Sequence, residues 1–124
     1  MTVYEAICRV DALKFNTFPR EEKLRWLAEL EGNVVVQVIR KHAGGEKVTF
    51  AGFDADADLQ TRLLVEAPFD TVYLRWLEAQ IDYHNGEYDK FNAAMRLFNA
   101  AWENFENDYK QNHPPVSRGG RFRF

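Results

Sequence analysis

The sequence has few of the residues on which cross-links and covalent catalysis depend. It contains one cysteine, Cys8, so an internal disulfide framework is excluded. We predict that Cys8 is a small core residue of an N-terminal helix, rather than a nucleophile paired with His42 or His84. The one serine, Ser117, lies among Pro, Gly and Arg residues near the C terminus, which argues against a serine nucleophile held on a rigid turn. We therefore predict that the protein is not an enzyme.

Long apolar runs are also missing. The longest aliphatic run is Val34–Val36, far shorter than the roughly 20 residues that span a bilayer. Residues 1–18 have neither the cationic start nor the continuous apolar stretch of a secretory signal. We expect a soluble, cytoplasmic chain with no membrane partner. Its 124 residues predict one domain with its own apolar core.

Metal and cofactor motifs are incomplete. Asp54, Asp56 and Asp58 resemble the start of a calcium loop, but Leu59 and Val65 occupy the positions that need Gly and Glu. The histidines stand at predicted helix ends rather than at ligand spacing, where they favour capping of the last carbonyl groups: His42, His84 and His113. The sequence predicts neither a metal nor a cofactor.

Charge is divided unevenly along the chain. All 19 acidic residues precede Pro114, whereas residues 1–113 hold 13 of the 16 basic residues, a net charge of −6. The last 11 residues carry three arginines and no acid. We predict a helical domain over 1–113 and a flexible basic arm over 114–124. The acidic domain argues against a surface that binds nucleic-acid phosphates.

Two helices are predicted in the N-terminal third. Thr2 and Glu5 have the spacing of a capping box, which predicts a helix over about residues 3–14. A second helix is expected from about Pro19 to His42, with Thr17 as a plausible cap. Its buried stripe contains one polar exception, Glu31, among Leu24, Leu27, Leu30, Val34, Val35, Val38 and His42.

The segment 43–67 lacks helical periodicity. It has two extended candidates, residues 48–50 and 63–65, on either side of the acidic run. We predict a short extended loop or a β-hairpin. A connection of this length in a small domain is usually functional or ordered by a partner.

A long antiparallel hairpin is predicted in the C-terminal half. Its first helix begins at Pro68 and ends at Asn85-Gly86. Its wide apolar arc predicts that the helix is either central in the bundle or shared between the bundle and another subunit. Arg75, Glu78 and Asp82 are expected on an exposed polar edge. The second helix, about 87–110, repeats a heptad whose seam should lock the hairpin internally: Tyr88, Phe91, Met95, Phe98, Trp102, Phe105 and Tyr109. The predicted fold class is therefore mainly α, a small bundle of about four helices.

The C-terminal residues Arg118-Gly-Gly-Arg-Phe-Arg-Phe124 mix cations with aromatic rings. Three interpretations stay open: an inert solvated end, docking onto a protein partner, or contact with nucleic acid. The two phenylalanines favour docking, because exposed apolar side chains usually have a partner. The candidate docking residues are Arg118, Arg121, Phe122, Arg123 and Phe124.

Several stretches carry a resemblance to a known family. They are Glu21–Leu30, Leu64–Asp70, Tyr73–Tyr83, Tyr83–Asn92 and Phe98–Ala101. Over about residues 4–113 this pattern of packing positions resembles the small head-tail connector, or adaptor, proteins of tailed bacteriophages. The tail departs from the pattern.

The resemblance implies a structural virion protein at the neck, assembled in the host cytoplasm. Such connectors are helical bundles that form a homo-oligomeric ring, typically of twelve subunits, beneath the portal protein. They extend the channel for genomic DNA, without sequence-specific binding, and join the tail or its stopper protein. The candidate intersubunit contacts are Phe50, Phe53, Leu74 and Ile81, and the C-terminal arm would reach the portal. The alternative is a small helical nucleic-acid-binding regulator that uses the arginine-rich tail.

Overall fold

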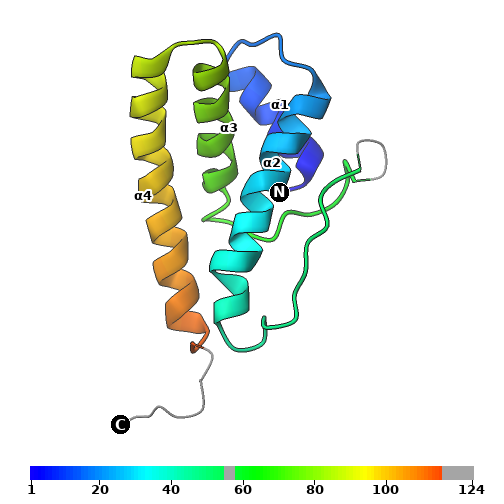
Figure 1. Ribbon diagram of the computed structural model, residues 1–124, viewed down its shortest axis with the longest axis vertical. Helices are drawn as coiled ribbons and strands as arrows, with labels where there is room; N and C mark the ends of the chain where they lie inside the picture. Colours follow the sequence, from blue (N-terminus) through cyan, green and yellow to red (C-terminus); the bar gives the residue numbers. More distant parts are fainter. Residues whose placement is uncertain (55–57, 116–124) are drawn as a thin grey trace.

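The computed structural model describes residues 1–54 and 58–115 (Figure 1). These residues form four α-helices and one 3-10 helix, and no strand longer than an isolated bridge. The elements are α1 (Val3–Leu13), α2 (Arg20–Gln37), η1 (Ile39–Lys41), α3 (Thr71–His84) and α4 (Tyr88–Asn112). The predicted mainly helical bundle is confirmed. Helix α3 is central, since it contacts each of the other three α-helices.

Helix α1 begins with the predicted capping box. The Glu5 amide donates to the Thr2 hydroxyl over 3.1 Å, and the Thr2 amide donates to the Glu5 carboxylate over 2.7 Å. The side chains that face the core are Val3, Ala6, Ile7 and Val10. The prediction for Cys8 is wrong, because its side chain is exposed. Each residue turns a helix by about 100°, so Cys8 lies off the face that Ile7 shares with Val3 and Val10.

The predicted stripe is buried, including Glu31, but its last members Val38 and His42 lie beyond helix α2, whose ends differ from expectation. Pro19 is the N-cap and no side chain caps the helix, so Thr17 does not have the predicted role. The helix ends at Gln37, and Val38 has φ −122° and ψ −62° before the turn of η1. The β-branched residues at this end have low helix propensity, which accounts for the early end.

The 43–67 connection is an extended loop, and the β-hairpin alternative is wrong for its described residues. Residues 48–50 and 63–65 do not pair with each other. The second of these segments instead adjoins the start of the chain, where Leu63 N donates to Met1 O over 2.9 Å. The residues just before it bond to the first turn of α1, from Val3 N to Thr61 O (2.9 Å) and from Tyr4 N to Leu59 O (2.8 Å). The first amides of a helix have no intrahelical partner, and the loop carbonyls supply one.

Helices α3 and α4 form the predicted antiparallel hairpin. Gly86, with φ +76°, makes the turn, a conformation that glycine adopts without steric cost. Ring centroids of Trp76 and Phe98 lie 5.2 Å apart, so the heptad seam contacts α3. Phe98 and Phe105 are buried, whereas Tyr88 is 59% exposed and its ring lies 5.7 Å from that of Tyr83 in α3. The other seam residues are half-buried: Phe91, Met95, Trp102 and Tyr109.

The C-terminal end of α4 lies beside the end of α2 and η1. Ala43 N donates to Pro114 O over 2.7 Å, and Pro115 forms a bridge with His42. The first two residues of the predicted arm are therefore bonded to the helical domain. No helix in the described part of the chain has the length and apolar character needed to cross a membrane.

Candidate functional site

Glu31 and Tyr73 form a buried polar network between α2 and α3. The Tyr73 hydroxyl donates to Glu31 Oε1 over 2.6 Å, and Leu64 N donates to Glu31 Oε2 over 2.9 Å. Val65 N in turn donates to the Tyr73 hydroxyl over 2.8 Å. Both side chains are almost fully buried. The network therefore fixes the backbone of residues 64–65 against two helices.

Burial sets the electrostatics of this network. Desolvation raises the pKa of Glu31, although the bonds from Tyr73 and Leu64 act in the opposite direction. Burial and the adjacent carboxylate raise the pKa of Tyr73 above its ordinary value, so the phenol keeps its proton and donates it to Glu31. Both side chains are buried, and they bond to each other and to the backbone of Leu64 and Val65. The network is therefore a structural support for the 64–65 segment.

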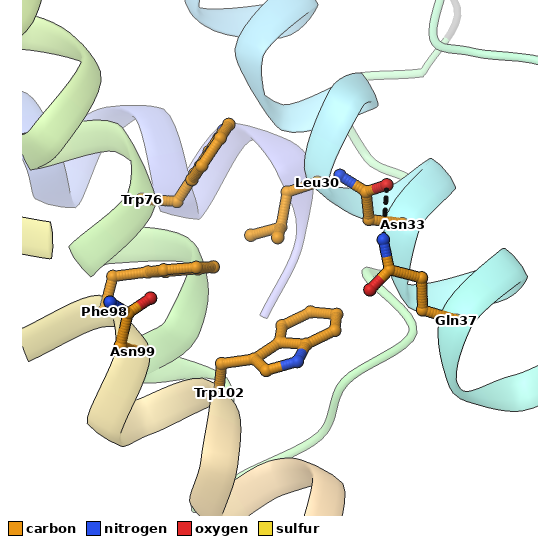
Figure 2. Close-up of a pocket in the computed structure, with 7 residues that line it drawn as sticks. All are labelled: Leu30, Asn33, Gln37, Trp76, Phe98, Asn99 and Trp102. Atoms are coloured by element: carbon orange, nitrogen blue, oxygen red, sulfur yellow. Dashed lines mark hydrogen bonds between the residues drawn. The ribbon is translucent and has the colours of Figure 1, made fainter.

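An aromatic cleft opens between α2 and α4, with a volume of about 240 Å³ (Figure 2). Helix α2 contributes Leu30 and two amides, and α3 and α4 contribute three rings and one amide; the lining residues are Leu30, Asn33, Gln37, Trp76, Phe98, Asn99 and Trp102. Trp76 is held in place because its indole N–H donates to Trp26 O over 2.8 Å. Gln37 donates to Asn33 over 3.3 Å, as Figure 2 shows. The cleft was not predicted, since its walls come from segments far apart in the sequence.

A protruding apolar corner lies at the connection between α1 and α2. Phe15 is 88% exposed and Leu13 is 62% exposed. Single exposed apolar residues are ordinary, but a phenylalanine exposed to this degree presents nearly its whole ring to solvent. The corner precedes the N terminus of α2, whereas the cleft contacts its C-terminal half. The two surfaces therefore lie near opposite ends of this helix.

A second groove, the α4 groove, lies between the last turns of α4 and the 64–69 segment. Its volume is about 230 Å³, and its lining includes Ile39, Glu66, Phe69, Phe105, Asp108 and Tyr109. Burial raises the pKa of Tyr109, whose ring stacks on His113 with centroids 3.9 Å apart. His113 also lines the groove. The groove thus combines aromatic walls with two carboxylates.

The candidate intersubunit residues fall into two groups. Leu74 and Ile81 are 4% and 0% exposed, so they pack inside the protomer and are not available to another subunit, contrary to expectation. Phe50 and Phe53 are half-buried in the loop, with an edge-to-face contact at 4.9 Å. The docking residues lie outside the part of the chain that the structure describes: Arg118, Arg121, Phe122, Arg123 and Phe124.

The predicted polar edge of α3 is only partly exposed. Arg75 and Glu78 pair over 3.1 Å on the surface. Asp82, in contrast, is 2% exposed and accepts two bonds from Lys14, at 2.7 and 2.9 Å. The expectation of an exposed Asp82 is wrong, because the end of α1 covers it.

The histidine prediction is confirmed. Each Nδ1 lies within hydrogen-bond distance of the carbonyl oxygen four residues earlier: His42 to Val38 (2.6 Å), His84 to Gln80 (2.9 Å) and His113 to Tyr109 (3.1 Å). A carbonyl only accepts, so Nδ1 carries the proton in each ring. In residues 1–54 and 58–115, no three His, Cys, Asp or Glu side chains gather where they could hold a metal ion.

Comparisons with known proteins give no indication of function for this chain. The chain matches no protein-family model, no curated protein and no solved structure. The candidate site is therefore defined by the aromatic cleft, the apolar corner and the α4 groove.

Proposed function

We propose that the chain is a structural virion protein, a head-tail connector that forms a ring beneath the portal, extends the DNA channel and joins head to tail. The observation that supports this proposal best is the presence of two different apolar surfaces, the corner at Phe15 and the aromatic cleft at Trp102, near opposite ends of α2. A contact between unlike surfaces of identical subunits repeats around an axis and closes into a ring when the rotation allows it. Two such surfaces are what ring assembly requires of each subunit.

Charge is a second support. Residues 1–113 carry a net charge of −6, and such a surface repels nucleic-acid phosphates. A channel wall of this sign lets DNA pass without being held. The pattern of packing positions that resembles connectors also includes Tyr83–Asn92, the stretch that contains the α3–α4 turn.

The test is binding to the portal ring encoded in the same genome. The purified chain at micromolar concentration should co-sediment with that ring, and absence from the pellet would refute the proposal. Phe15→Asp should weaken co-sedimentation, because it places a charge on the exposed corner without entering the core. Tyr4→Asp is the matched control, since Tyr4 is 43% exposed on α1 and lies in neither surface.

The alternative regulator makes a different prediction. If the arginines of the tail bind nucleic acid, a mobility shift with duplex DNA or RNA should weaken steeply with salt and disappear when the tail is deleted. The deletion should begin at Val116, because Pro114 accepts a bond from Ala43 and Pro115 pairs with His42. A mobility shift of this kind, together with no binding to the portal ring, would favour the regulator over the connector as the function of the chain.

A further inference from the structure

The α4 groove has the chemistry of a site for a short segment with cations and aromatic rings. Phe69 and Phe105 contribute rings and Ile39 adds aliphatic surface, while Glu66 and Asp108 contribute carboxylates. Neither carboxylate forms an ion pair with another described residue; Asp108 accepts only from Asn112, at 3.2 Å. The groove therefore presents apolar surface beside two negative charges that are available for pairing.

The chain itself contains one segment of matching chemistry. Arg121-Phe-Arg-Phe124 alternates two cations with two rings, and all three arginines after Pro114 fall within the last seven residues. Arginine pairs with carboxylates through two parallel hydrogen bonds, and its neighbouring phenylalanines suit an aromatic wall. Charge and side-chain type are thus complementary between this segment and the groove.

The tether makes the encounter intramolecular. His113 lines the groove, and the described chain continues two residues further, to Pro115, which is held at His42. The five residues between Pro115 and the motif, 116–120, can span about 17 Å when extended. That length exceeds the roughly 12 Å that separates Phe105 from His113 along α4. A linker of this length gives a millimolar effective concentration.

We infer that the α4 groove binds the Arg121–Phe124 motif at the C terminus of the same chain. The arginines pair with Glu66 and Asp108, and the phenylalanine rings cover the wall formed by Phe69 and Phe105. Binding in this position withholds the motif from other partners until one competes for it. The inference does not depend on the connector function, because it concerns the isolated protein.

Trypsin, which cleaves after arginine, measures whether the motif is held. The rate of cleavage after Arg121 in the full chain is followed by mass spectrometry and divided by the rate for a free peptide of residues 114–124. A tethered motif held in the groove should be cleaved about tenfold more slowly than the peptide. Equal rates for chain and peptide would overturn the inference.

Two sets of variants identify the groove. Glu66→Gln/Asp108→Asn should abolish the protection, whereas Glu29→Gln/Glu103→Gln, which removes two exposed charges elsewhere, should leave it intact. Phe122→Ala/Phe124→Ala, compared with its own free peptide, should also lose protection. Protection unchanged by the groove variant would refute the assignment. Protection that rises with protein concentration would place the motif in the groove of a second copy and overturn binding within one chain.

Discussion

Replacing Tyr73 by phenylalanine tests the energetic importance of the buried network. The hydroxyl donates to Glu31 over 2.6 Å and accepts from Val65 N over 2.8 Å, so Tyr73→Phe removes both bonds and keeps the ring. A hydrogen bond to a charged group contributes about 1.5–3 kcal/mol, and a buried donor left without a partner costs about 1–3 kcal/mol. We expect the free energy of unfolding to fall by about 3–4 kcal/mol at neutral pH.

The pH dependence of that loss has a defined sign. Burial raises the pKa of Glu31 in the folded state, so folding is most favoured below the ordinary glutamate pKa, and stability falls as the pH rises through the folded-state pKa. The Tyr73 bond lowers the pKa of Glu31, and its removal should raise that pKa further. The difference between wild type and Tyr73→Phe should therefore increase from about pH 4 to pH 7.5.

Urea unfolding followed by circular dichroism at pH 4 and pH 7.5 measures both effects. Tyr4→Phe is the matched control, since this tyrosine is 43% exposed, and its loss of a hydroxyl should change stability by less than about 0.5 kcal/mol. If Tyr73→Phe is as mild as the control, the network does not stabilise the fold. A loss of the same size at both pH values would show that Glu31 does not titrate as its burial requires.

Three further substitutions test the hairpin and the covered charge. Phe98→Ala should lower the free energy of unfolding, measured by thermal unfolding, by about 3–5 kcal/mol, because the ring is buried. Leu97→Ala, at an exposed neighbouring position, should cost far less. A loss under about 1 kcal/mol for Phe98→Ala would contradict the packing of this ring. Asp82→Asn should cost about 1–3 kcal/mol at low salt because Lys14 loses its charged acceptor, and an unchanged melting temperature would argue against the pair. Gly86→Ala should cost about 1 kcal/mol in urea unfolding because its φ is +76°, and a neutral result would mean that the α3–α4 turn adopts another conformation.

Local patterns in the sequence predicted the helices well. The Thr2–Glu5 capping box, the heptad of α4 and the Asn85-Gly86 stop each depend on neighbours within a few residues, and each is present in the structure. Histidine capping succeeded for the same reason, because its partner carbonyl is four residues away. Where competing local preferences met, at the Val38 end of α2, the predicted boundary was too late.

Contacts between distant segments could not be predicted in this way. Glu31 was recognised as the polar exception in a buried stripe, but its partner Tyr73 is 42 residues away, and no local pattern connects them. The same holds for Asp82, whose partner Lys14 lies 68 residues earlier. The aromatic cleft and the α4 groove likewise combine walls from separate parts of the chain. These features depend on how the helices pack, which periodicity does not specify.

The outward position of Cys8 makes the protein suitable for counting subunits. It is the one thiol in the chain and lies on the exposed side of α1, so a maleimide dye attaches once per polypeptide without any engineered cysteine. Cys8 lies in neither the aromatic cleft nor the α4 groove. When single labelled particles bleach, the number of fluorescence steps then equals the number of chains in each particle.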